Sequence, residues 1–273
     1  MNLEEIFTQL EKEQEADCDL AEILLHLARD EYSDLDIEAY LSEIAGMAHE
    51  AKRLLRGKLP DRVHGLCRYL FHEMGFRGNT AEYYDPRNSY LNEVLDRRTG
   101  IPISLSILTM AVGSRAGLPV AGVGLPGHFV VKSVLNGEQV LFDPFHGGRQ
   151  LSTSDCEILV RQVTGMNFQA SEANLRPLSL RWIIARVLTN LKTVYFHQED
   201  YLRTIRVVQR LRQLTPGDPV LRRDLGISLV QAGYPGKAIE HLEAYLAAVV
   251  NPPDSKKLRK LLDRAYSLVG QWN

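Results

Sequence analysis

The chain has 273 residues, of which 45% are hydrophobic and 24% are charged, and its formal net charge is −2. This composition is typical of a globular protein with one or two domains, and without a basic excess it gives no support for nucleic-acid binding. The three cysteines, Cys18, Cys67 and Cys156, are too few and too far apart for a disulfide framework or a paired-cysteine metal motif, so we expect a reducing cytoplasm.

The first part of the chain is predicted to be helical. Its opening residues, MNLEEIFTQLEKE, are acidic, and no apolar stretch reaches the roughly 18 residues of a membrane span, so neither a signal peptide nor a transmembrane helix is expected. Apolar residues recur at helical spacing from residue 3 to residue 76, most clearly in Leu20–Leu27 and Ile37–Ala48. A third helix is predicted near Asp61–Met74.

Turn-forming residues break this pattern at Gly75–Asn79, after which we expect a loop and a short helix at Tyr90–Arg97. A longer helix is predicted to begin around Pro102, because proline is favoured in a first turn, where its missing N–H removes no hydrogen bond. Gly117 stands where a residue that ends this helix is expected.

Three strands are predicted next, at Val120–Leu125, His128–Leu135 and Glu138–Asp143. Asn136-Gly137 separates the last two and is a strong signal for a two-residue hairpin turn, because both residues accept positive φ angles. A helix followed by an antiparallel sheet predicts an α+β fold.

The hairpin places a histidine and an aspartate on one face. A two-residue loop pairs Leu135 with Glu138 and Val130 with Asp143, so His128 is diagonal to Asp143 at a Cβ separation of about 7–8 Å or somewhat less. This geometry indicates a catalytic dyad in which the carboxylate orients the imidazole. The alternative is structural, with the aspartate accepting hydrogen bonds from the turn that Asp143 begins.

After residue 177 the pattern is helical, and residues 185–252 divide into two 34-residue segments with matching apolar positions. This period, with the small residues Gly226 and Ala238 where two helices approach closely, predicts tetratricopeptide repeats. A final helix at Lys256–Trp272 is expected to cap the stack. A plain helical hairpin is the alternative.

The segments NSYLNEVLDRRTGIPISLSIL, GLPVAGVGLPGHFVV and LFDPFHGG resemble the bacterial SirB/YchA-type family. This resemblance implies a papain-like, transglutaminase-like domain at residues 1–175, including the N-terminal helices, and a tetratricopeptide-like helical domain at residues 176–273. In the wider superfamily a cysteine begins a helix, and a histidine and an aspartate stand on adjacent strands. His128 and Asp143 match the last two positions.

The cysteine has no counterpart, because its position falls at Pro102 or Ile103. Cysteine-based transglutaminase or protease chemistry is therefore not expected. Ser106, or less favourably Ser104, could replace the nucleophile, although serines at a helix start more often bond to the backbone. Cys67 is interpreted as a small buried hydrophobic residue.

Other polar residues could contribute to the same site. His128, Asp143 and His146 offer two histidines and one carboxylate to a metal, but no ligand pair on a helix supports them and no metal or cofactor is predicted. The resemblance implies that a polar segment near the proposed cleft contributes to the site, but it assigns no individual roles. The residues of this segment are Asp85, Arg87, Asn88, Glu93 and Arg97.

Two functions follow from these residues. The missing cysteine favours a non-catalytic adaptor, which would bind a protein or peptide through its cleft and its tetratricopeptide-like tail and would use neither nucleic acid nor a membrane. The alternative is a serine-dependent hydrolase or acyl transferase with a Ser106-His128-Asp143 arrangement.

Overall fold

The computed structural model describes residues 3–12, 15 and 18–270. It divides into two compact units, Met1–Ile184 and Ala185–Asn273, and each is described by itself. The predicted boundary after residue 175 lies before this division. Within the described residues, the helices are too short or too polar to cross a membrane.

Four helices open the first unit, and their starts follow from the sequence. Aspartate side chains cap the second and third helices, since Asp19 accepts a hydrogen bond from the Ala21 N–H and Asp36 accepts one from the Ala39 N–H. The third predicted helix changes to a π-helix at Arg68–Glu73, the segment η1. The helices are α1 (Leu3–Glu11), α2 (Leu20–Ala28), α3 (Ile37–Lys52) and α4 (Leu59–Cys67).

The segment between η1 and the sheet holds short elements. A parallel pair of two-residue strands, β1 (Arg77–Gly78) and β2 (Thr99–Gly100), encloses the 3-10 helix η2 (Pro86–Ser89) and the helix α5 (Leu91–Arg97). The longer helix α6 (Pro102–Arg115) begins with proline in its first turn, as predicted.

The sheet confirms the α+β prediction. Its antiparallel strands lie in the order β3 (Val120–Leu125), β4 (His128–Leu135), β5 (Glu138–Asp143) and β6 (Arg149–Leu151), and the first three have the predicted bounds. The fourth strand was not predicted, because three residues are too few to show an alternating pattern.

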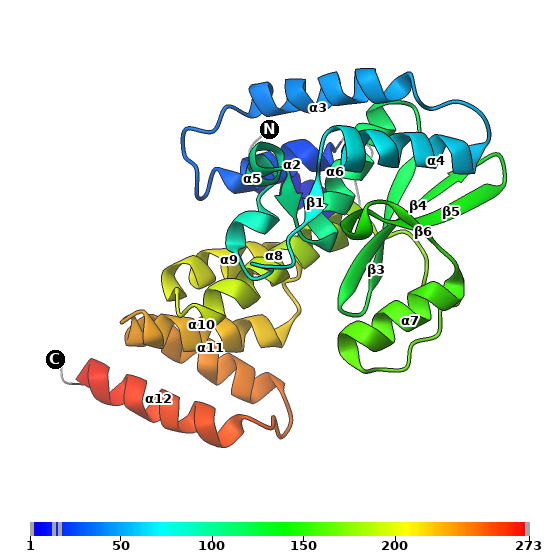
Figure 1. The fold of residues 1–273 in the computed structure, drawn as a ribbon. Coiled ribbons are helices and arrows are strands. Elements are labelled where there is room, and N and C mark those ends of the chain that lie inside the picture. The colour runs from blue at the N-terminus through cyan, green and yellow to red at the C-terminus, as the bar shows by residue number, and fades with distance from the viewer. Residues whose placement is uncertain (1–2, 13–14, 16–17, 271–273) are drawn as a thin grey trace. The chain divides into compact units, whose positions relative to one another are not determined.

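Helices cover the sheet and close the core. Helix α6 packs against β3 and β4, and helix α7 (Thr153–Thr164) packs against β4 and β6 beside the sheet (Figure 1). The buried residues between the sheet and α7 are Val123, Leu125, Val130, Leu141, Cys156, Val160 and Leu175.

The second unit confirms the 34-residue period. The helices α8 (Leu180–His197) and α10 (Pro219–Gln231) end 34 positions apart, and α9 (Tyr201–Leu214) and α11 (Pro235–Ala248) begin 34 positions apart. Successive helices from α9 onward pack against each other. A last helix, α12 (Ser255–Gly270), packs against α11 where the capping helix was predicted, although Trp272 lies outside the described residues.

Helices α10 and α11 approach each other closely at Gly226. A Cβ at this position would lie 2.7 Å from the Leu242 side chain and 3.3 Å from the Leu242 backbone nitrogen. Overpacking of this kind destabilises a fold by about 1–3 kcal/mol. We therefore expect Gly226→Ala to lower the urea midpoint of unfolding, measured by circular dichroism.

Gly236 provides the matched control on α11. Its substitution by alanine places Cβ no closer than 3.6 Å to any neighbour, at the Val269 side chain. Alanine is a better helix former than glycine by roughly 1 kcal/mol, so Gly236→Ala should leave the midpoint unchanged or raise it. An equal loss of stability in both variants would contradict the close approach at Gly226.

Candidate functional site

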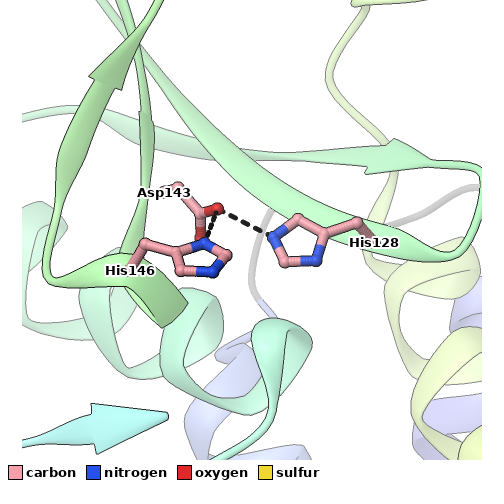
Figure 2. Close-up of side chains that lie close together, drawn as sticks. All are labelled: His128, Asp143 and His146. Atoms are coloured by element: carbon pink, nitrogen blue, oxygen red, sulfur yellow. Dashed lines mark hydrogen bonds and ion pairs between the residues drawn. The ribbon is translucent and has the colours of Figure 1, made fainter. Parts of the chain in front are cut away.

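The β4–β5 hairpin has the predicted register and joins His128 to Asp143. Asn136 and Gly137 have φ angles of 51° and 84°, and Leu135 pairs with Glu138. This register places His128 and Asp143 on the sheet face that carries the α7 core, because side chains two residues apart share a face. His128 Nε2 lies 2.9 Å from Asp143 Oδ2 (Figure 2).

The Asp143 carboxylate holds a second histidine. The chain turns after Asp143 into the 3-10 helix η3 (Pro144–His146), and His146 Nδ1 lies 2.7 Å from the same oxygen, Oδ2 (Figure 2). Oδ1 accepts the Phe145 backbone N–H at 3.0 Å. The sequence predicted a catalytic pairing of Asp143 with His128 alone. For His146 it suggested only a possible role as a metal ligand.

Electrostatics favour a charged carboxylate at this site. Burial alone would raise the pKa of Asp143, but hydrogen bonds from His128 and His146 and attraction to their positive charges lower it to about 2. The hydrogen bond to Asp143 raises the pKa of His146. The carboxylate therefore stays ionised and can orient an imidazole and stabilise an imidazolium.

Burial distinguishes the two histidines. The side chains of His128 and Asp143 are 4% and 1% exposed, whereas that of His146 is 52% exposed. The rings of the two histidines are stacked, with centroids 5.8 Å apart. His146 is therefore the member of the cluster that a molecule in solution meets first.

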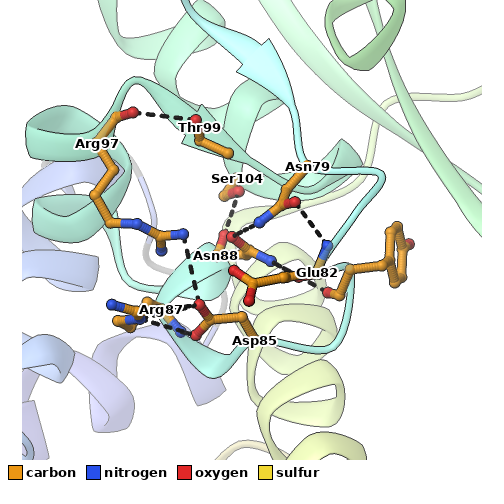
Figure 3. A network of polar contacts seen from close by, with 9 residues as sticks. Asn79, Glu82, Asp85, Arg87, Asn88, Arg97, Thr99 and Ser104 are labelled. Carbon is orange, nitrogen blue, oxygen red and sulfur yellow. Dashed lines mark hydrogen bonds and ion pairs between the residues drawn. The ribbon is translucent and has the colours of Figure 1, made fainter.

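Asn88, in the polar segment before α5, has a structural role (Figure 3). Asn88 is fully buried, and its Nδ2 donates to the carbonyls of Glu82 at 2.7 Å and Tyr83 at 3.2 Å. Its Oδ1 accepts from Asn79 Nδ2 at 3.0 Å. These bonds fix the loop. The sequence indicated that Asn88 contributes to this region, but it did not indicate which groups Asn88 would bond.

The charged residues of this segment form ion pairs at its surface (Figure 3). Arg87 Nη2 lies 2.7 Å from Asp85 Oδ2, and Arg97 Nη2 lies 3.5 Å from the same oxygen. Glu93 is half-buried on α5. These contacts do not include His128, Asp143 or His146.

An aromatic contact connects this loop to the histidine cluster. The Phe145 ring lies edge-on to His128, with centroids 6.0 Å apart, and to His146, with centroids 5.2 Å apart. Tyr83 packs edge-on against Phe145 at 6.2 Å and is 38% exposed. Tyr83 and Phe145 therefore lie beside the cluster, although no sequence motif pointed to either residue.

Comparison with known proteins identifies the first unit. Residues 38–189 match the model of the transglutaminase-like superfamily, and residues 191–263 match a tetratricopeptide repeat model. The chain belongs to the transglutaminase-like superfamily. The predicted order, a transglutaminase-like domain followed by tetratricopeptide repeats, is confirmed.

Bacterial relatives of this transglutaminase-like protein match most of the chain, and a human relative matches less than half of it. A UPF0162 protein of Xylella fastidiosa is 37% identical over 81% of both chains, and one of Vibrio cholerae is 27% identical over 80% of this chain and 81% of its own. F-box only protein 21 of Homo sapiens is 33% identical over 44% of this chain and 20% of its own. No solved structure matches the chain.

Helix α6, on which the sequence analysis placed the missing nucleophile, begins with Pro102. The next residue, Ile103, is 2% exposed. Ser104 is tied to the backbone, because its Oγ donates to the Asn88 carbonyl at 2.6 Å and accepts the Ile101 N–H at 3.0 Å. Ser104 therefore has the structural role expected of a serine in a first helical turn.

Ser106 differs from Ser104 in its surroundings. It is fully buried, and its Oγ has no hydrogen-bond partner among the described residues. The serine hypothesis requires a hydrogen bond between Ser106 Oγ and His128. Within the described part of the chain this bond is not formed. His128 and Asp143 are brought together, but Ser106 does not join them.

The buried cysteines are poor nucleophiles. Burial raises the pKa of the Cys67 thiol to about 12. Burial, together with the charges of Asp155 and Asp143, raises the pKa of Cys156 to about 11. Both thiols are protonated at neutral pH, and a thiol attacks far more slowly than a thiolate.

The low pKa of Asp143 predicts a specific loss of stability in acid. A lowered folded-state pKa stabilises the fold above the unfolded value of 3.8, and this contribution disappears as the pH falls towards about 2. A shift of this size is worth about 2 kcal/mol. We expect the wild type to lose this amount relative to Asp143→Asn between pH 5 and pH 2, in urea unfolding followed by circular dichroism.

The exposed Asp34 supplies the control. Asp34→Asn should follow the wild-type pH dependence, since this side chain takes no part in the cluster. Parallel curves for the wild type and Asp143→Asn over this pH range would contradict the ionised, hydrogen-bonded state of Asp143.

Proposed function

We propose that this protein is a non-catalytic, transglutaminase-like adaptor that binds a protein or peptide. The proposal rests on the sequence prediction that Pro102 or Ile103 stands at the superfamily's cysteine position, and it is supported by the start of α6 at Pro102. Covalent acyl transfer needs a nucleophile within hydrogen-bond reach of its base. The protonated state of Cys67 and Cys156 supports the same conclusion.

The tetratricopeptide unit offers a binding pocket of about 240 Å³. It is lined by helices α8 and α10 and by Asp254; the α8 and α10 residues are Lys192, Thr193, Phe196, His197, Arg223, Asp224 and Ile227. Repeats of this kind bind partner segments on such surfaces. A partner peptide is therefore the ligand we propose for this pocket.

The chemistry of the pocket suits a segment with both charged and apolar groups. Asp224 is buried and accepts from Lys192 Nζ at 2.6 Å, while Arg223 lies 2.8 Å from the other oxygen of the same carboxylate. Phe196 adds an apolar surface that is 38% exposed. The fixed charges would orient a peptide, and the ring would contact its apolar side chains.

The transglutaminase-like unit would supply a second surface, at His146 and its aromatic neighbours. Exposed aromatic and imidazole groups are frequent in protein interfaces. We also propose that the protein acts in a reducing cytoplasm, which is supported by the reduced thiols of Cys18, Cys67 and Cys156, since none of these three residues forms a disulfide in the described part of the chain.

A serine-dependent hydrolase or acyl transferase remains the alternative function. The observation in its favour is the unpaired hydroxyl of Ser106, whose proton is not used by another group among the described residues. A change of rotamer that joins Ser106 to His128 would be needed before the histidine could act as its base.

Labelling with electrophiles distinguishes the two functions. We expect a fluorophosphonate to leave Ser106 unmodified, and a chloroacetamide probe to modify the half-exposed Cys18 faster than Cys67 or Cys156, as measured by intact mass and peptide mapping. A stoichiometric adduct on Ser106 that disappears in both Ser106→Ala and His128→Ala would overturn the adaptor proposal in favour of the hydrolase.

Photocrosslinking tests the peptide pocket directly. A benzophenone amino acid at position 196 should give discrete crosslinked partner bands in bacterial cells, because Phe196 lines the pocket. The same group at Leu202, which is 61% exposed and outside the pocket, is the matched control. Absence of bands at position 196, or identical bands at both positions, would count against binding in this pocket.

A further inference from the structure

Three metal-ligating side chains converge at the end of the hairpin. One ligand atom from each of His128, Asp143 and His146 lies within 4.8 Å of the other two. The atoms in hydrogen-bond contact are His128 Nε2, Asp143 Oδ2 and His146 Nδ1, as Figure 2 shows. Two imidazole nitrogens and one carboxylate oxygen are a donor set that suits divalent transition metals.

We propose that these three atoms form a site for a divalent transition metal ion such as Zn²⁺, with a further coordination position open to solvent. The proposal does not depend on the adaptor function. That function is argued from the pocket between α8 and α10 and from the predicted loss of the nucleophile, and the metal site uses neither feature.

An ion would have to draw the two imidazole nitrogens together, because the three ligand atoms now span up to 4.8 Å, and to separate each nitrogen slightly from the carboxylate oxygen. Tetrahedral zinc with bonds near 2.0–2.1 Å places its ligand atoms about 3.3 Å apart. The two nitrogens now lie 2.9 Å and 2.7 Å from Oδ2, so an ion would widen each separation by roughly 0.5 Å in that geometry. An ion would replace the two histidine–carboxylate hydrogen bonds with direct bonds to the metal.

The surroundings determine which ligands are fixed and which can move. His128 and Asp143 are buried at adjacent strand ends, and the Phe145 N–H orients the carboxylate by binding Oδ1. His146 is half-exposed and precedes Gly147 and Gly148, both with positive φ. The third ligand can therefore adjust to the ion, while the first two keep their positions.

The exposure of His146 also leaves room for a further ligand. Three protein ligands with one open position are the arrangement of zinc sites that bind water or a substrate oxygen. Water, or a carbonyl or carboxylate oxygen of a bound peptide, is the ligand class that this position would accept. Mg²⁺ should bind poorly, since it prefers oxygen ligands.

Calorimetry with Zn²⁺ tests the site in the full-length chain. The purified protein, free of any histidine tag, is stripped with a chelator and titrated with zinc chloride. We expect one saturable equivalent, and at least about a tenfold loss of affinity in His146→Ala, because a ligand is removed. His49→Ala, which removes an exposed histidine from α3, is the control and should bind as the wild type does.

Cobalt provides a second measurement that needs no variant. Co²⁺ in a four-coordinate site with nitrogen and oxygen ligands should give intense visible absorption bands, and Zn²⁺ should remove them. Failure of the wild type to take up Zn²⁺, or undiminished affinity in His146→Ala, would overturn the assignment. A thiolate-to-cobalt band would also overturn it, because it would place the ion on a cysteine.

Discussion

The burial of the Asp143 carboxylate is the constraint that organises the transglutaminase-like site. An ionised carboxylate removed from water costs several kcal/mol unless hydrogen bonds and opposite charge compensate for it. Here both oxygens are used, one by the Phe145 N–H and the other by His128 and His146. The strand, the turn and the short helix η3 are held together by one group.

The same carboxylate also positions His128. His128 is positioned by Asp143 and by packing against Phe145, and neither contact involves the start of α6. In our proposals this arrangement serves the binding of a peptide or of an ion.

The two units have different chemistry, and we propose a different binding role for each. The first unit offers imidazole and carboxylate groups on a rigid sheet, and the second offers a pocket between repeated helices. In that pocket Asp224 is buried between Lys192 and Arg223, so its charge is compensated much as the charge of Asp143 is. Both sites place fixed charges beside exposed aromatic rings.

The sequence by itself determined the features that depend on local backbone chemistry. The turn at Asn136-Gly137, the register of the hairpin and the 34-residue period follow from φ preferences and spacing, and the register placed His128 diagonal to Asp143. Only the tertiary structure decided which partners the polar side chains take. Partner choice depends on which groups are buried together, so neighbours in sequence gave no indication that Ser104 would bond to Asn88 or that Ser106 would remain unpaired.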